Sequence, residues 1–156
     1  MSTDSPAPTG RLIVIEGIDR SGRSTQVRLL LDWLRRRGYE PIRTDWSTSP
    51  HISKAIHKAK AAGELRPITF SLFYAADFTD RVANVIVPAL ERGEIVVADR
   101  YVYTAFARDV ARGANQAWLE TLYGFAPEPD AVFYLRVPPD VTKDRVPSTP
   151  VKAIDR

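Results

Sequence analysis

Cysteine is absent from the 156 residues of this chain. Its absence excludes disulfide bonds and thiolate-ligated metal centres, and it is compatible with a reducing compartment. Histidine is scarce as well, with only His51 and His57 present, and neither has a partner at metal-ligand spacing. We therefore expect both histidines to lie on the surface.

Long apolar runs are also missing, since no stretch is long enough to cross a lipid bilayer. Residues 1–10 lack the basic and apolar segments of a secretory signal. We therefore predict a cytoplasmic protein with no membrane partner. The net charge is only +3 and the basic residues are scattered, which favours small anionic ligands over nucleic acid.

What the sequence does contain is typical of one globular domain, with 44% hydrophobic and 26% charged residues. We predict a disordered leader at 1–10, a folded domain at 11–145 and an irregular tail at 146–156. Four segments predict strands, and they alternate with helical patterns. This alternation favours a parallel sheet covered on both sides, a three-layer α/β/α fold. The predicted strands are Leu12–Ile15, Glu40–Thr44, Glu94–Tyr101 and Ala131–Val137.

A glycine-containing loop, Gly17–Thr25, lies between the first strand and an amphipathic helix. Such a loop curls its backbone N–H groups around a polyphosphate, and the helix N-terminus adds partial positive charge. The spacing matches G-x-x-x-x-G-K-[ST], except that Arg23 stands where lysine is usual. The alternative is a glycine turn that only joins strand to helix. The predicted ATP site comprises Gly17, Ile18, Asp19, Arg20, Ser21, Gly22, Arg23, Ser24 and Thr25.

A carboxylate, Asp99, lies near the end of the predicted strand Glu94–Tyr101. An acid at the carboxyl end of a strand beside a phosphate-binding loop is well placed to hold Mg²⁺ or its waters. We therefore predict that Ser24 and Asp99 bind Mg²⁺. The alternative is a structural ion pair between Asp99 and Arg100.

Several motifs in this order resemble thymidylate kinases, which are phosphate-loop nucleoside monophosphate kinases. The resemblance covers Arg11 to about Arg145. It implies a P-loop NTPase fold of the nucleoside monophosphate kinase type, a homodimer, and transfer of the ATP γ-phosphoryl group to dTMP with Mg²⁺. The motifs that carry it are Ile15–Gln26, Phe73–Asp77, Pro88–Gly93, Asp99–Tyr101 and Pro129–Asp130.

The resemblance also implies roles for individual residues. The catalytic residues would be Arg20, Arg23 and Asp99, with Arg20 stabilising the migrating phosphoryl group. Arg100 would hold the acceptor phosphate, and Tyr74 would stack on the base. The full set implied to bind the acceptor is Asp45, Tyr74, Phe78, Arg81, Arg100 and Thr104.

The chain departs from the family pattern at several points. Arg23 replaces the lysine of the loop, and Phe78 replaces an arginine for which Arg81, one helical turn on, is a candidate substitute. Arg108-Asp109 replaces a Tyr-Gln pair. The sequence also stops where the family continues into a lid, a last strand and a C-terminal helix, so we expect a C-terminally truncated form of the fold. The alternative function is therefore a catalytically weakened or inactive nucleotide-binding domain or fragment.

Overall fold

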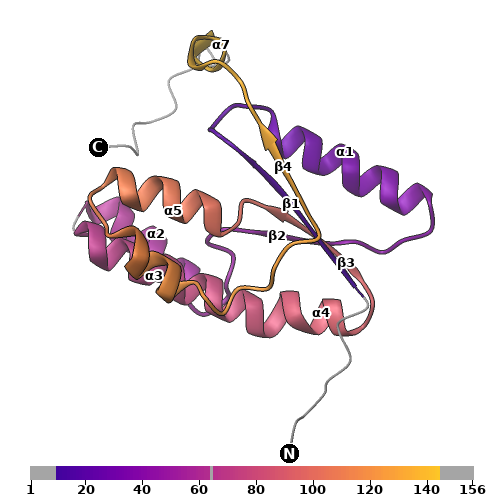
Figure 1. Ribbon diagram of the computed structural model, residues 1–156, viewed down its shortest axis with the longest axis horizontal. Coiled ribbons are helices and arrows are strands. Elements are labelled where there is room, and N and C mark those ends of the chain that lie inside the picture. The colour runs from indigo at the N-terminus through magenta and orange to yellow at the C-terminus, as the bar shows by residue number, and fades with distance from the viewer. Residues whose placement is uncertain (1–9, 64, 145–156) are drawn as a thin grey trace, which may run out of the picture.

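Four parallel strands form one sheet in the computed structural model, which describes residues 10–63 and 65–144. The strand order is β2-β3-β1-β4, and every neighbouring pair is parallel (Figure 1). The predicted parallel sheet is therefore confirmed, whereas the predicted leader, apart from Gly10, and the tail lie outside the described residues. The strands are β1 (Arg11–Gly17), β2 (Ile42–Asp45), β3 (Ile95–Asp99) and β4 (Ala131–Leu135).

Helices cover both faces of this sheet, and Figure 1 shows α1 on one side with α3, α4 and α5 on the other. The three-layer α/β/α prediction is therefore confirmed. The helices are α1 (Arg23–Arg36), α2 (Ser53–Ala62), α3 (Pro67–Arg81), α4 (Val87–Glu91), α5 (Val102–Ala111), α6 (Gln116–Leu122) and α7 (Pro139–Asp144).

The alternation of side chains along β1 explains how both faces are filled. Leu12 and Val14 are buried in the larger core, which the helices of the α3–α5 side complete. Ile15 points the other way and packs with Val27 and Leu31 of α1. Because successive residues of a strand face opposite sides of a sheet, an apolar run on β1 supplies both cores.

The sequence predicts a long helix that begins at Pro67 and that Pro88 either bends or carries into a last turn before Gly93. In the structure this helix changes form before Pro88. A five-residue π-helix, Val82–Ile86, joins α3 to α4. Proline has no N–H to donate to the carbonyl of Asn84 four residues earlier, and its ring crowds that carbonyl. The wider π-helical turn accommodates both effects.

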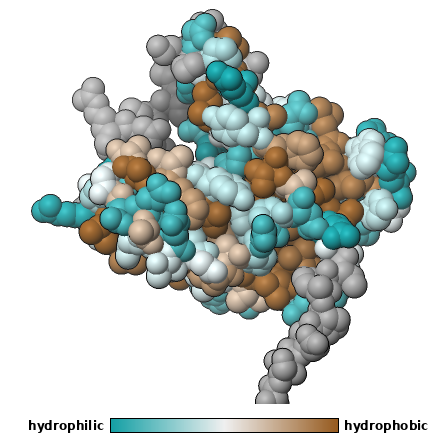
Figure 2. Space-filling model, in the orientation of Figure 1, coloured by the Kyte–Doolittle hydropathy of each residue, from teal (hydrophilic) through white to brown (hydrophobic). Residues whose placement is uncertain are grey.

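Apolar side chains remain on the surface, as Figure 2 shows for one face of the molecule. On β4, Val132, Phe133 and Tyr134 are all exposed.

None of the helices in the described part of the chain is both long enough and apolar enough to cross a membrane.

Candidate functional site

The loop between β1 and α1 is held in a tight conformation that depends on its glycines. Gly22 is the N-cap of α1 and has a φ of 93°, in the left-handed region that favours glycine. A Cβ atom on Gly17 would lie only 2.7 Å from the Ser21 hydroxyl oxygen and 3.1 Å from the Leu135 carbonyl oxygen. The loop therefore leads directly into the N-terminus of α1, a fourteen-residue helix. The N-terminus of a helix is a favourable place for an anion.

Arg23 bridges the ends of two neighbouring strands. Its Nε donates to Asp99 Oδ1 at 2.5 Å, and its Nη1 donates to the Gly17 carbonyl at 2.6 Å. The side chain is only 12% exposed. Two different nitrogens of the planar guanidinium make these bonds, and a lysine has only one nitrogen to offer. The arginine therefore has a structural use at this position.

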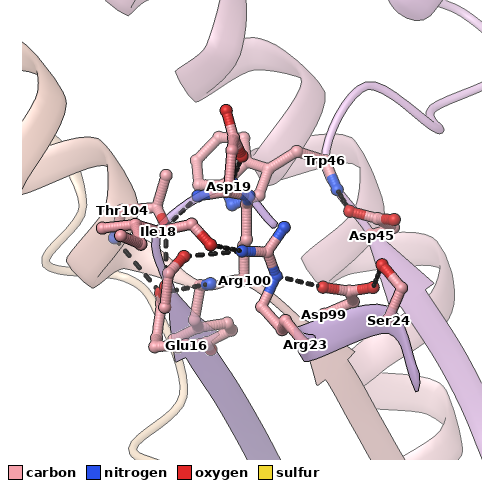
Figure 3. Close-up of polar contacts among 12 residues, drawn as sticks. Glu16, Ile18, Asp19, Arg23, Ser24, Asp45, Trp46, Asp99, Arg100 and Thr104 are labelled. Carbon is pink, nitrogen blue, oxygen red and sulfur yellow. Dashed lines mark hydrogen bonds and ion pairs between the residues drawn. The ribbon is translucent and has the colours of Figure 1, made fainter. Parts of the chain in front are cut away.

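Asp99 and Asp45 end adjacent strands in register with each other (Figure 3). Arg43 Nη2 donates to both, at 3.0 Å to Asp99 Oδ2 and 3.3 Å to Asp45 Oδ2. Ser24 donates to Asp99 Oδ2 at 3.3 Å. Burial and the neighbouring charge of Asp99 raise the pKa of Asp45 above its ordinary value. The arrangement concentrates two carboxylates and a hydroxyl beside the loop.

This oxygen set suits Mg²⁺, which binds proteins through one or two carboxylates and takes its other ligands from phosphates and water. Within residues 10–63 and 65–144, no cluster of three or more His, Cys, Asp or Glu side chains is arranged to hold a metal by itself. The alternative Asp99–Arg100 ion pair is not formed there, because the carboxylate partner of Arg100 is Asp19. The arginines on Asp99 are Arg23 and Arg43.

Arg100 follows β3 with a φ of 77°, and this left-handed turn ends the strand two residues earlier than the sequence predicts. Its Nη2 pairs with Asp19, and its Nη1 donates to the Thr104 hydroxyl at 3.1 Å. That hydroxyl in turn donates to Glu16 Oε2 at 2.6 Å. A chain of hydrogen bonds thus links the loop, Arg100 and the first turn of α5 (Figure 3).

Glu16 is a residue that the sequence analysis did not single out. It is 5% exposed, and its Oε1 accepts from the backbone N–H groups of Tyr101 at 2.8 Å and Thr104 at 3.2 Å. The carboxylate therefore caps the N-terminus of α5 from a strand far away in the sequence. The available signal was an ionisable residue at the end of the apolar run Leu12–Ile15.

A cavity of about 560 Å³ adjoins the loop. Gly17, Ile18 and Asp19 line it on the loop side, and aromatic residues including Phe70 and Tyr74 line it elsewhere. Its volume suits a ligand of nucleotide size. Three of the residues predicted to bind the acceptor line this cavity, namely Tyr74, Arg100 and Thr104.

The other predicted acceptor residues lie outside the cavity lining. Asp45 belongs to the cluster around Asp99. Phe78 is fully buried among aromatic rings, including that of Trp46. Arg81 is 2% exposed, and it donates to Asp77 Oδ2 at 3.0 Å and to the Thr44 hydroxyl at 2.7 Å. Burial lowers the pKa of the Arg81 guanidinium.

The two histidines, expected on the surface, are both exposed.

The catalytic candidate Arg20 is also exposed, with a φ of 63° in the loop. Ser21 is buried within the loop, whereas Thr25 is exposed in the first turn of α1. The structure therefore brings the loop, the two acids and Arg100 to one edge of the sheet.

Comparison with known proteins places these features among nucleotide kinases. Residues 15–150 match the family model described as thymidylate kinase. The chain is 46% identical over 137 residues to "Probable thymidylate kinase 2" of Saccharolobus solfataricus, covering 88% of this chain and 64% of that relative. It is 38% identical over 150 residues to "Probable thymidylate kinase" of Thermococcus kodakarensis, covering 90% and 73%.

A bacterial protein, "Thymidylate kinase" of Brachyspira hyodysenteriae, is 30% identical over 138 residues, which are 88% of this chain and 68% of that protein. The matches thus span 64–73% of the length of these three relatives.

Proposed function

Since this chain belongs to the thymidylate kinase family, we propose that it transfers the γ-phosphoryl group of ATP to dTMP, giving ADP and dTDP. The resemblance drawn from the sequence is confirmed by the match. The observation that carries the proposal is one of position: the phosphate-binding loop forms part of the wall of the nucleotide-sized cavity. A donor on the loop and an acceptor in the cavity would therefore meet at the same edge of the sheet.

The loop residues Gly17–Thr25 supply the ATP site. Backbone N–H groups at the start of α1 have no acceptors within the helix, so they are suited to phosphate oxygens. Arg23 and Arg20 add positive charge around the loop. In a loose phosphoryl-transfer transition state most catalysis is positioning and electrostatic stabilisation, and Arg20 is our candidate for the group beside the migrating phosphoryl.

The reaction needs no general base. One P–O bond forms between an acceptor phosphate oxygen and the γ-phosphorus, and the bond from that phosphorus to the β–γ bridging oxygen breaks. The acceptor oxygen is already anionic at neutral pH. Arg100, which Asp19 and Thr104 hold in place, is our candidate for orienting the acceptor phosphate, and Tyr74 for contacting the base.

Ser24 and Asp99 would hold Mg²⁺, with Asp45 as a neighbouring second carboxylate. The ion would supply charge neutralisation for the polyphosphate. Arg23 and Arg43 already contact the Asp99 carboxylate, so these side chains hold the acid in place and keep its charge compensated before nucleotide binds.

A second candidate function, a nucleotide-binding domain with weakened catalysis, is favoured by one observation. The guanidinium of Arg23 is committed to Asp99 and to the Gly17 carbonyl. An arginine that keeps these bonds would contribute less to a bound phosphate. The homodimer and the cytoplasmic location stay predictions, and sedimentation of the purified protein tests the first.

An ADP-release assay with Mg-ATP and dTMP, dUMP, dCMP, UMP or CMP tests the two functions. Turnover with dTMP supports the kinase. Binding of Mg-ATP in a calorimetric titration without turnover of any acceptor supports the weakened domain, and absence of ATP binding contradicts both.

Arg20→Gly serves as the control for contaminating kinases. Glycine suits the φ of 63° at this position, so the variant removes the guanidinium without adding strain. We expect kcat to fall roughly 10²-fold or more, within the range for an arginine that stabilises a phosphoryl transition state. An unchanged kcat would remove Arg20 from the mechanism.

A further inference from the structure

Arg108 of α5 lies against the aromatic wall of the cavity. Its guanidinium carbon is 4.3 Å from the ring centroid of Tyr74 and 4.7 Å from that of Phe70. A guanidinium at these distances from aromatic rings is attracted by their π-systems. In the sequence, Arg108 is notable only as a departure from the family pattern. In the structure it is one of the residues that line the cavity.

The next residue fixes the orientation of this guanidinium. Asp109 is buried, and Arg108 donates to it twice, from Nε at 2.6 Å and from Nη2 at 3.2 Å. This two-point contact holds the planar guanidinium group of Arg108 in one orientation. The third nitrogen, Nη1, makes no hydrogen bond to the residues that the structure describes. It can donate but cannot accept, and because Arg108 lines the cavity, this nitrogen is available to an acceptor oxygen of a bound ligand.

Two other residues of the implied acceptor-binding set, Thr104 and Arg81, make their hydrogen bonds to groups of the protein itself. Thr104 donates its hydroxyl proton to Glu16 and accepts from Arg100. Arg81 is buried against Asp77 and Thr44, outside the cavity lining. Neither is placed to hydrogen-bond the edge of a base, whereas the Arg108 guanidinium lies against both aromatic rings of the cavity wall, Phe70 and Tyr74.

The cavity lining near that wall includes further cationic side chains. Lys60 and Arg112 line the cavity as well, and Arg112 lies 4.4 Å from the Phe70 ring centroid. The two acids of the lining are Glu16 and Asp19, which are bonded to the α5 N-terminus and to Arg100 respectively. A base in this part of the cavity therefore meets cationic donors without a free carboxylate.

We propose that Arg108 determines which acceptor base is used, by donating from Nη1 to the 4-oxo group of a pyrimidine. Thymine and uracil present an acceptor oxygen at this edge. Cytosine presents an amino group, which would oppose N–H to N–H and leave both donors unsatisfied. The inference rests on the proposed function, because it takes the cavity as the acceptor site, and it deepens that function to monophosphates of 4-oxopyrimidines.

The test compares Arg108→Lys with wild-type enzyme on dTMP, dUMP, dCMP and the deoxynucleotide of 2-pyrimidinone, which lacks the 4-substituent. Lysine keeps a positive charge beside the buried Asp109, which helps the variant to fold, but it lacks the guanidinium group and its Nη1 donor. We expect kcat/KM for dTMP and dUMP to fall about 10- to 100-fold, as for a lost hydrogen bond to a charged group. The values for dCMP and the 2-pyrimidinone nucleotide should change less than about threefold.

Arg28→Lys is the control, because it makes the same change at an exposed arginine of α1 that does not line the cavity. Its dTMP/dCMP ratio of kcat/KM should equal that of wild type. If Arg108→Lys lowers kcat/KM equally for all four acceptors, the side chain acts through charge alone and the proposal is wrong.

Calorimetric titration of dTMP and dCMP without ATP separates this inference from the proposed function. If no acceptor is phosphorylated, the kinase proposal fails, but tighter binding of dTMP than of dCMP that Arg108→Lys abolishes still supports the base-reading role. If wild-type protein binds dTMP no more tightly than dCMP, the inference is overturned even where turnover is observed.

Discussion

Two arginines of the loop, Arg20 and Arg23, are three residues apart and have different environments. Arg23 is nearly buried and is bonded to Asp99 and to the Gly17 carbonyl. Arg20 is exposed at a positive φ. Arg23 replaces the lysine that is usual at this position, so a planar guanidinium stands where a compact ammonium is expected. The sequence did not reveal that this shape is used, because Asp99 is 76 positions away and only the parallel pairing of β1 with β3 brings it close.

The first residue-scale prediction concerns Arg23→Lys. A single ammonium cannot reproduce bonds made from Nε and Nη1, so the variant should lose about 1–3 kcal/mol in free energy of unfolding. The released positive charge becomes available to ATP, so the affinity for Mg-ATP should be equal to or higher than that of wild type. Urea unfolding and calorimetric titration measure the two effects.

Lys54→Arg, an exposed position in α2, is the surface control and should leave both quantities unchanged within error. An Arg23→Lys protein that keeps wild-type stability and binds ATP more weakly would show that the guanidinium contacts the nucleotide and not the scaffold.

The second residue-scale prediction concerns the pH dependence of stability at Asp45. Burial first, and then the charge of Asp99, raises the pKa of Asp45 in the folded protein. Folded protein therefore binds more protons than unfolded protein between the ordinary pKa and the raised one, so this group lowers stability as the pH rises through that window. Asp45→Asn should be more stable than wild type at pH 7, by a margin that shrinks toward pH 4.

Urea unfolding of both proteins at several pH values measures this margin. Asparagine keeps an oxygen that accepts from the Trp46 N–H, a bond of 2.7 Å in the native site, so the comparison isolates the charge. A margin that stays constant from pH 4 to pH 7 would contradict the assignment.

Strand β1 contributes to the cores, to the phosphate-binding loop and to the capping of α5. It contributes apolar residues to both cores, it ends in the phosphate-binding loop, and through Glu16 it caps α5. Local patterns were sufficient to predict the strand and the following helix, because both signals lie within a few residues. They did not predict the cap, which joins residues 85 and 88 positions apart.

The helix before Pro88 shows a related limit. The proline predicted a disturbance in a long helix, and a disturbance is present. Its form, the π-helix Val82–Ile86, depends on how α3 and α4 pack against the sheet and was not predictable from the residues alone.

The element-scale prediction is that Glu16→Gln loosens α5 from β1. Glutamine offers one acceptor oxygen where the carboxylate accepts from two N–H groups and the Thr104 hydroxyl. We expect a loss of about 1–3 kcal/mol in free energy of unfolding, as for a buried group left without a partner. The KM for dTMP should also rise, because Thr104 helps to hold Arg100.

Glu128→Gln provides the comparison, since this acid is exposed and its change should stay within about 0.5 kcal/mol. Equal stability of the two variants would show that the Glu16 contacts are energetically neutral. A loss of stability without a change in KM would confine Glu16 to a structural role.

At the scale of the whole molecule, the order of the strands in the sheet determines which residues meet at the candidate site. The sequence predicted a parallel sheet with helices on both faces, but it did not predict the order β2-β3-β1-β4. That order places β3 between β2 and β1, so that Asp99 is in register with Asp45 on one side and with Ile15 on the other. Residues from three separate parts of the chain meet because their strands end at one edge.

The whole-molecule prediction follows from this shared edge. If the loop and the cavity form adjoining subsites, a conjugate in which adenosine and thymidine are joined through five phosphates should bind more tightly than either nucleotide, because the second contact becomes intramolecular. At a hundred times its Kd, such a ligand stabilises the protein by about 2.7 kcal/mol. For a chain of this length that corresponds to a Tm increase of roughly 5–10 °C.

Thermal unfolding measures the shift with the conjugate, and with an equimolar mixture of ATP and dTMP at the same concentration. The conjugate should give the larger increase. Arg100 lies between the loop and α5 and is bonded to both, so Arg100→Gln should reduce the advantage of the conjugate by weakening the acceptor end. A conjugate no better than ATP alone would mean that the cavity does not receive the second nucleotide, and the acceptor site would have to be sought elsewhere along the edge of the sheet.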